Sequence, residues 1–189
     1  MLPSLWHTLQ PQGSQRLYAL IDAAAHTHIH AHIEAWQPPS IALHPPGFDL
    51  PDEAAPWLVH LKPGNTFSEW YLQEGFLLGW GIVLHSTHKM LILAEQLIPW
   101  LVAQQTDTQQ RLLIRFYDPV IIQAYLSLLS SVERAQILNG ISGIWRPVNV
   151  AGIVEHLIPT ETGLMRQTTD LRTLSIAQEE PDESRHADL

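Results

Sequence analysis

Four short, almost entirely apolar runs constrain the fold of this chain more than any other feature. They are "RLYALID" (16–22), "PWLVHL" (56–61), "WGIVLHS" (80–86) and "RLLIRFYD" (111–118). Each run has the length of a strand and ends at a polar or turn-forming residue. Because their apolarity is continuous rather than alternating, we expect strands that are covered on both faces.

Helical patterns separate these runs. They span residues 23–36, 67–77, 87–104, 120–129 and 131–138. Strands that alternate with helices are typical of βαβ units, in which the crossover helix joins parallel strands. The sequence therefore predicts an α/β fold with a central mixed, largely parallel sheet, helices on both faces, and a small C-terminal region of strands and turns.

The chain has 189 residues, of which 46% are hydrophobic, and this length fits one globular unit. We expect a domain over residues 1–145 and a short, variable C-terminal extension, residues 146–177, packed on it. The last segment, 178–189, contains "EEPDESRHADL", which is acidic and poor in apolar residues. Such a composition predicts a disordered acidic tail.

Two helix starts carry the Ser/Thr-x-x-Glu spacing of a capping box. The pairs are Thr66 with Glu69 and Ser130 with Glu133. In a capping box each side chain satisfies a backbone N–H of the other residue, which is typically worth ~1 kcal/mol. Asn139 and Gly140 are expected to end the helix that Ser130 begins.

Composition excludes several classes of function. The chain has no cysteine, so disulfide and thiolate chemistry are excluded. A net charge of -9 with only ten scattered Lys and Arg argues against a nucleic-acid groove. The longest apolar stretch, "FLLGWGIVL", is too short to span a bilayer, so we expect a soluble, cytoplasmic protein without a membrane span. No phosphate loop, dinucleotide-binding glycine pattern or nucleophile elbow is present, and no cofactor is expected.

Four strand-end residues define an enzyme alternative. Asp22, Asp118, His85 and His88 follow predicted strands, where open α/β sheets place their ligand sites. Two carboxylates and two imidazoles would suit a divalent metal in a metal-dependent hydrolase. Helix capping explains the same positions without a ligand, because Asp118 precedes Pro119, Asp22 precedes a helix, and Ser86 or Thr87 can cap the next one.

The stretch "HTHIHAHIEAW" (26–36) has a histidine at every second position. On a strand, all four imidazoles would share one face and would be a metal candidate. The neighbouring alanines favour a helix instead. On a helix, Ala25, Ile29, Ile33 and Trp36 form an apolar stripe, with His26 and His30 on one flank and His28 and His32 on the other. Four-ligand binding by this segment alone is then excluded, although either pair could hold a metal with outside ligands.

The stretch "LLIRFYDPVIIQAYLSLLSSVERAQILNGISGIW" (112–145) resembles the type VI secretion effector-chaperone family, whose most specific motif is Arg-Phe-Tyr-Asp-Pro. "LYALIDAA", "PWLVHL" and "WGIVLHS" resemble its earlier strands in the same order, although Ala23 stands where the family usually has Gly. The positions that match the family pattern are Tyr18, Asp22, Trp57, Ser86, Arg115, Phe116, Tyr117, Asp118, Pro119 and Trp145.

The resemblance implies an adaptor chaperone of Gram-negative bacteria rather than an enzyme. Such a protein binds a toxic effector and helps to load it onto the spike protein of the secretion apparatus. We expect Asp118 and Pro119 to be structural caps and Arg115 to pair with a carboxylate such as Asp22.

A chaperone must cover an apolar segment of its client, so exposed apolar residues after Trp145 are expected to bind the effector. These residues are Val148, Val150, Ile153, Val154, Leu157 and Ile158. A further alternative is a regulatory domain that senses pH through the eleven histidines, which ordinarily titrate near pH ~6.5.

Overall fold

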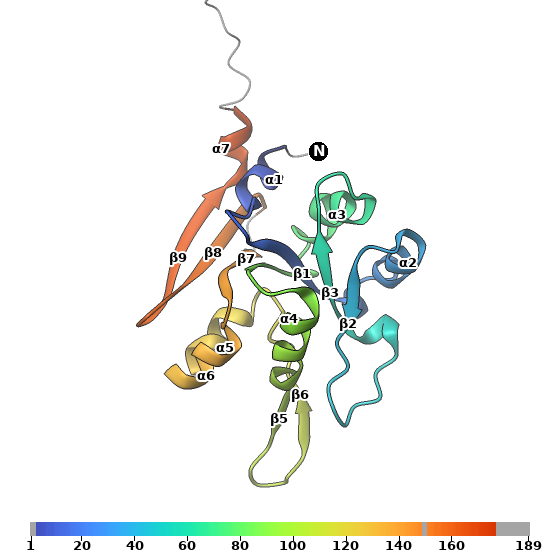
Figure 1. Ribbon diagram of the computed structural model, residues 1–189, viewed down its shortest axis with the longest axis vertical. Coiled ribbons are helices and arrows are strands. Elements are labelled where there is room, and N and C mark those ends of the chain that lie inside the picture. The colour runs from blue at the N-terminus through green and yellow to red at the C-terminus, as the bar shows by residue number, and fades with distance from the viewer. Residues whose placement is uncertain (1–2, 149–150, 177–189) are drawn as a thin grey trace, which may run out of the picture.

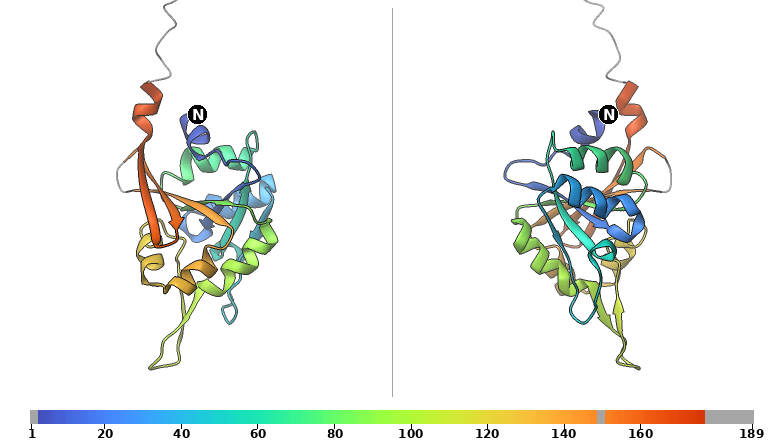
Figure 2. Two further views of the ribbon diagram at one scale, coloured as in Figure 1. Left: turned by 60° about the vertical axis from the view of Figure 1, so that its left-hand side comes forward. Right: turned by 90° about the vertical axis from the view of Figure 1, so that its right-hand side faces the viewer.

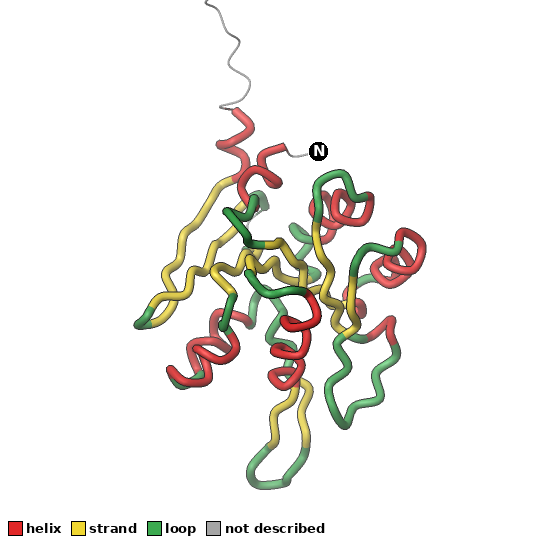
Figure 3. Tube along the Cα trace, viewed as in Figure 1, coloured by secondary structure: helices red, strands yellow, loops and turns green. Residues whose placement is uncertain are grey.

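In the computed structural model, which describes residues 3–148 and 151–176, one seven-stranded antiparallel sheet organises the chain. The strand order is β2-β3-β1-β4-β7-β8-β9, and every neighbouring pair is antiparallel. The strands of this sheet are β1 (Arg16–Asp22), β2 (Ser40–Ala42), β3 (Pro56–Leu61), β4 (Gly81–Ser86), β7 (Ile141–Pro147), β8 (Ile153–Thr160) and β9 (Gly163–Asp170). Figure 1 and Figure 3 show the sheet crossing the middle of the molecule.

The prediction of a largely parallel sheet is wrong, and the topology of residues 16–86 explains why. The helix α2 (Thr27–Trp36) connects β1 to β2, and α3 (Thr66–Trp70) connects β3 to β4. Each crossover joins two parallel strands, but a third strand lies between them: β3 separates β1 from β2, and β1 separates β3 from β4. This is the split βαβ arrangement of ferredoxin-like folds. The sequence reveals the crossover but not the strand inserted within it.

Both faces of the sheet are buried, as continuous apolarity predicts. In β1, Leu17, Ala19 and Ile21 pack into one core, whereas Tyr18 and Leu20 pack into the other. Helices cover both faces, which confirms that part of the prediction. An antiparallel sheet with two covered faces gives the same apolar runs as a parallel one, so these runs do not determine strand direction.

One face is covered by helices that carry many aromatic residues. We call α2, α3 and the π-helical turn η3 (Tyr71–Gly75) the aromatic layer. Ile29 and Ile33 of α2 and Phe67 of α3 are buried against the sheet. The short helices α1 (Pro3–Leu9) and α7 (Leu171–Ile176) contact each other and lie on the same face, near β7 and β8. The right-hand view of Figure 2 shows α2 and α3 side by side.

The other face is covered by the long connection between β4 and β7. We call its helices α4 (Met90–Leu97), α5 (Ile122–Leu128) and α6 (Ser131–Ile137) the aliphatic layer. A 3-10 turn, η4 (Ile98–Leu101), leads from α4 into a separate two-stranded hairpin of β5 (Val102–Gln104) and β6 (Arg111–Leu113). The hairpin projects away from the sheet (Figure 1).

Several element predictions fail in this connection. Residues 111–118 do not form a strand of the main sheet: only Arg111–Leu113 is a strand, and it belongs to the hairpin. The helix predicted over 87–104 is limited to Met90–Leu97 and the short turn η4, and it gives way to β5. Part of this apolarity serves the outer layer, because Leu97, Leu101, Phe116 and Tyr117 are buried in the core on this face of the sheet. Apolarity alone does not distinguish this location from a sheet strand.

The predicted caps have mixed outcomes. The capping box of Ser130 and Glu133 is confirmed, with α6 beginning at Ser131. Gly140 follows α6 with φ +68°, a conformation that glycine adopts without strain. The box at Thr66 is wrong: Asn65 caps α3 by accepting from the Ser68 backbone N–H, and Glu69 accepts from the Gly64 backbone N–H instead.

Two further 3-10 turns complete the described elements. They are η1 (Ala23–Ala25) and η2 (Asp52–Ala54). After β7, the chain adds β8 and β9 to the edge of the same sheet, and the left-hand view of Figure 2 shows these two long strands as a twisted ribbon. The predicted acidic tail, 178–189, lies outside the described residues.

Candidate functional site

The ion pair between Asp22 and Arg115 is the first feature of the family-signature region. The Arg115 guanidinium donates to the Asp22 carboxylate, which is 7% exposed at the end of β1, whereas the Arg115 side chain is 51% exposed. The expected pairing of these residues is confirmed. It joins the sheet to residues 114–121, so it fixes the segment that leads into α5.

Burial governs the electrostatics around this pair. It raises the pKa of Asp22, and the Arg115 charge beside it acts in the opposite direction. Burial also raises the pKa of Tyr117 far above its ordinary value, and the carboxylate of Asp22 adds to that shift. The buried Asp22 carboxylate and Tyr117 phenol therefore have a structural role: they connect the sheet to the segment that contains Arg115.

The capping predictions for the two signature aspartates hold in part. The Asp22 carboxylate accepts from the backbone N–H of Ala24 and caps the 3-10 turn η1. The Asp118 carboxylate accepts from the backbone N–H of Val120 at 2.8 Å. Pro119 is not the first residue of a helix, because α5 begins only at Ile122. Asp118 therefore stabilises a turn that precedes the helix.

Arg146 forms a second joint, which the sequence analysis missed. Its Nε and Nη2 donate to the Glu155 carboxylate at 3.0 and 2.6 Å, and Nη1 donates to the Pro119 carbonyl at 2.6 Å. Nη2 also donates to the Gln123 side chain at 2.8 Å. This nearly buried guanidinium binds β7, β8 and the start of α5 together. The sequence signal for this joint was a single arginine inside the otherwise apolar stretch "GIWRPV".

The remaining signature residues lie in separate places. Tyr18 donates to the His88 carbonyl at 3.0 Å, and Ser86 donates to the Gly140 carbonyl at 2.9 Å. Trp57, near the start of β3, donates to the Asp52 carbonyl at 2.8 Å. Each of these bonds secures a loop to a strand, and the three do not converge on one site.

Trp145 belongs to a buried cluster with two imidazoles. Its ring stacks on His156 of β8 with centroids 4.1 Å apart and 3° between planes, and His85 lies beside both. A Cβ at Gly143 would stand 2.1 Å from His156 Nε2, so the glycine makes room for this ring. His85 Nε2 lies 2.7 Å from the Leu9 carbonyl of α1. Burial lowers the pKa of His156 to about 4.

The four residues of the metal alternative do not form a site. Leu17 pairs with His85 and Ile21 pairs with Gly81, so antiparallel pairing places Asp22 and His85 at opposite ends of the sheet. Within residues 3–148 and 151–176, no group of three His, Asp or Glu side chains is arranged to hold a metal ion. The sequence argument required parallel strands, whose carboxyl ends share one edge.

The histidine run forms a helix, but its predicted division into two pairs is wrong. His26 is the N-cap of α2, with an extended backbone (φ -157°, ψ 137°), and its Nδ1 accepts from the His28 N–H. Its ring therefore lies 4.7 Å from His28 rather than beside His30. His30 lies on the other flank, where its ring is 5.7 Å from Trp57. The backbone of a cap residue is not helical, so the helical spacing used in the sequence analysis does not give the position of its side chain.

The apolar residues after Trp145 form little exposed surface. Val154 and Leu157 are fully buried in the two cores, so the expectation that they are exposed is wrong. Val148, Ile153 and Ile158 are half-buried, and Val150 lies outside the described residues. Strand β8 extends the sheet, and Val154 and Leu157 are buried because they pack into the cores on its two faces.

Exposed aliphatic side chains gather instead on the aliphatic layer. Leu128 is 85% exposed and Val132 is 66% exposed, and both lie where α5 meets α6. Leu91 and Ile92 of α4 are 61% and 50% exposed. We call Leu128 and Val132, the pair at the junction of α5 and α6, the aliphatic patch. A shallow depression between α4 and α6 is lined by Gln96, Ser131, Val132, Ala135, Gln136 and Asn139.

Comparison with known proteins gives a family without a described activity. No curated protein and no solved structure matches the chain. None of the helices in the described part of the chain has the length and apolarity that crossing a membrane requires. A family model, described as a domain of unknown function (DUF4123), matches residues 17–136, which include β1 and both partners of the Asp22–Arg115 pair. The chain therefore belongs to the DUF4123 family.

Proposed function

We propose that this protein is a non-catalytic adaptor chaperone, which binds a type VI secretion effector and helps to load it onto the spike protein. The observation that carries the proposal is the aliphatic patch. Leu128 and Val132 are largely exposed on helices whose inner faces are fully packed. Exposed aliphatic side chains that are four residues apart at a helix junction are typical of a surface that a partner covers.

The patch stands on a rigid support, which favours binding. The Gln96 side chain of α4 donates to the carbonyls of Ile137 and Asn139 at 2.8 and 3.0 Å and so ties α4 to the end of α6. Arg134 donates to the carbonyls of Leu126 and Leu129 at 3.0 and 2.9 Å, which fixes α6 against α5. A surface that is already ordered loses less entropy when a partner binds.

The joints of the signature region support the same function. Both Arg115 and Arg146 connect the sheet to the segment that leads into α5. The most specific residues of the resemblance to effector chaperones therefore hold the patch in place. In this proposal the signature motif acts as a support for the binding surface.

Co-purification tests the proposal. The full chain would be co-expressed with the product of the toxin gene nearest to its own gene, and a stable complex is expected. Leu128→Asp combined with Val132→Asp should reduce the captured effector at least about tenfold, because two charges would be buried in an apolar contact. The matched control is Leu78→Asp, which changes another exposed leucine, outside the patch.

Secretion assays provide the second half of the test. Deletion of the gene should abolish secretion of the effector, and the wild-type chain should restore it while the double variant does not. Normal secretion from the deletion strain would refute the adaptor role. Full capture by the double variant would show that the effector binds elsewhere and would refute the assignment to the aliphatic patch.

A further inference from the structure

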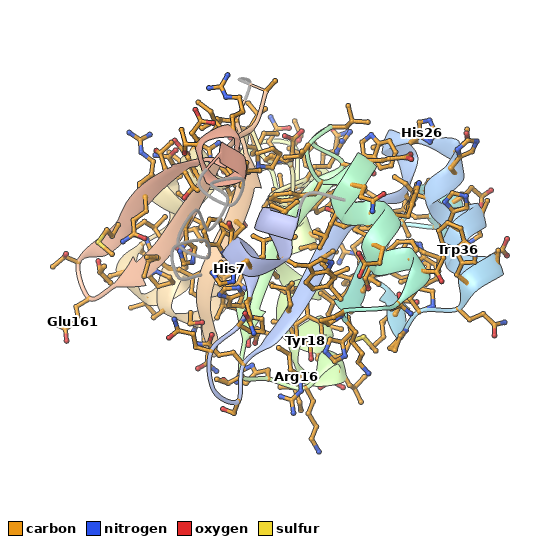
Figure 4. The ribbon with its side chains drawn as sticks, turned by 90° about the horizontal axis from the view of Figure 1, so that it is seen from above. His7, Arg16, Tyr18, His26, Trp36 and Glu161 are labelled. Carbon is orange, nitrogen blue, oxygen red and sulfur yellow. The ribbon has the colours of Figure 1, made fainter. Side chains whose placement is uncertain are left out.

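A continuous row of aromatic rings crosses the aromatic layer, on the face of the sheet opposite the aliphatic patch. His26 stacks on Trp80 with centroids 4.8 Å apart and 15° between planes, and His28 follows at 4.7 Å. His32 lies 5.5 Å from His28 and stacks on Trp36 at 4.0 Å. Figure 4 labels His26 and Trp36 at the two ends of α2. With Trp70, which meets His32 edge-on at 4.3 Å, these residues form what we call the ring row.

The helix geometry places the rings in contact with each other and with solvent. His28, His32 and Trp36 follow each other at intervals of four, so they share one flank of α2. His26 and His28 are exposed, and His32, Trp36 and Trp70 are half-buried. At the base of the row, Gly75 leaves space for Trp80, since a Cβ there would stand 2.5 Å from the Trp80 ring. The row thus exposes the rings of His26 and His28, and in part those of Trp36 and Trp70.

The chain segment that contains the ring row is mostly acidic. Between Ala23 and Trp80 the chain has one basic residue, Lys62. The same stretch contains six acidic residues, Glu34, Asp49, Asp52, Glu53, Glu69 and Glu74. Glu74 is exposed and stands at the row itself, where it accepts from Trp70 Nε1 at 3.0 Å. This carboxylate keeps acceptor capacity for a further donor.

Aromatic faces beside a carboxylate match the chemistry of a guanidinium. Arginine stacks its planar, weakly hydrated head on aromatic rings and donates to carboxylates in a fixed fork. One arginine can use both features at once, with its plane against an exposed ring and its N–H groups toward Glu74. A lysine ammonium lacks the plane, and an acidic partner would be repelled.

We infer that the ring row binds an arginine-bearing segment of a partner protein. This inference goes beyond the proposed function and does not depend on it, because the ring row and the aliphatic patch lie on opposite faces of the sheet. Both surfaces can be occupied at the same time.

Titration of the full chain with short peptides tests the inference. The probes are acetylated, amidated tetra-arginine, tetra-lysine and tetra-citrulline, with calorimetry and tryptophan fluorescence as readouts at low salt. Tetra-arginine should bind at least about tenfold more tightly than tetra-citrulline, which keeps the planar shape but lacks the charge. It should also quench tryptophan fluorescence, because the rings would contact the guanidinium.

Variants locate the binding surface. Glu74→Gln and His28→Ala change exposed side chains of the ring row and should each weaken tetra-arginine binding at least about threefold. Glu34→Gln is the matched control, because Glu34 is an exposed carboxylate on the other flank of α2, beside His30. Unfolding curves verify that the variants remain folded.

Several outcomes would overturn the inference. Equal affinity for tetra-arginine and tetra-citrulline would remove the role of charge, and equal affinity for tetra-lysine would remove the assignment to arginine. Unchanged binding by both ring-row variants would move the site elsewhere. Failure of effector capture or secretion, in contrast, would count only against the proposed adaptor function.

Discussion

The aromatic layer and the aliphatic layer each cover one face of the sheet, but their outer surfaces differ. Phe67 and Ile29 are fully buried on one face of the sheet, and Leu126 and Leu97 are equally buried on the other. Outside, the first layer presents rings and carboxylates and the second presents aliphatic side chains. The comparison shows that core packing fixes only the inner faces of covering helices, so one sheet can support two unrelated binding surfaces.

The two layers also differ in how they are attached. The aromatic layer consists of the crossovers of the split βαβ unit, so each helix is bounded by strands of the central sheet. The aliphatic layer is one long connection. Arg115 joins it to the sheet through the ion pair with Asp22, and Arg146 joins it through hydrogen bonds to the Pro119 carbonyl and the Gln123 side chain. We therefore expect side-chain contacts to hold the helices of the aliphatic layer in position, whereas the flanking strands hold those of the aromatic layer.

The largest expected effect comes from breaking the more buried joint. Arg146→Ala leaves the Glu155 carboxylate without its main partner, and loss of one member of a buried ion pair typically costs ~3–5 kcal/mol. Urea unfolding measures the change in the free energy of unfolding. Arg166→Ala is the control, since Arg166 is exposed and 3.7 Å from Glu155, and should cost less than ~1 kcal/mol. Equal effects of the two variants would contradict the assigned joint.

Cavity-forming substitutions compare the inner and outer faces of the layers. Leu126→Ala and Ile29→Ala remove fully buried side chains, one from each layer, and each should lower the free energy of unfolding by ~2–5 kcal/mol. Leu128→Ala, two residues from Leu126 but 85% exposed, should change it by less than ~0.5 kcal/mol. A large loss for Leu128→Ala would show that its side chain supports the fold and would weaken its role in partner binding.

Acid should destabilise the buried cluster of Trp145, His85 and His156 through His156. The folded pKa of His156 is about 4, whereas an unfolded histidine titrates near ~6.5. The unfolded chain therefore takes up the proton first, so the stability that this residue contributes is complete above ~pH 6.5 and is lost as the pH falls toward 4. After allowance for partial exposure we expect a loss of roughly 1–2 kcal/mol.

The measurement is urea unfolding of the wild type and of His156→Gln at several pH values. The variant cannot titrate at this position, so its stability should fall less between pH ~6.5 and 4. Because burial also lowers the pKa of His85, part of the slope remains in the variant. Parallel curves for the two proteins would show that His156 does not contribute.

The smallest expected effect concerns the helix that carries Val132. Ser130→Ala removes one side of the capping box of α6 and should cost ~1 kcal/mol. Ser131→Ala, at the adjacent first helical position, should be neutral or slightly stabilising. If both substitutions have the same effect in urea unfolding, the capping box does not secure α6.

Local features of the fold were predictable because their causes are local. The bounds of β1 and β3, the helix over the histidine run and the Ser130–Glu133 box follow from apolar runs, alanines and fixed spacings within a few residues. The Asp22–Arg115 pair was also expected. The ring row was not, because its formation depends on Trp70 of α3 and on Trp80, which lie far from α2 in the sequence.

The sequence by itself determined the bounds of β1 and β3, the helix over the histidine run and the cover on both faces of the sheet, since these properties depend on each segment's own residues. Only the tertiary structure decided strand direction and neighbours. Insertion of β3 and β1 within the crossovers separated Asp22 from His85 and made the sheet antiparallel. Packing of β8 buried Val154 and Leu157 and left the exposed aliphatic side chains to α4, α5 and α6. The physical reason is that strand pairing joins residues far apart in the chain, whose contacts no local pattern specifies.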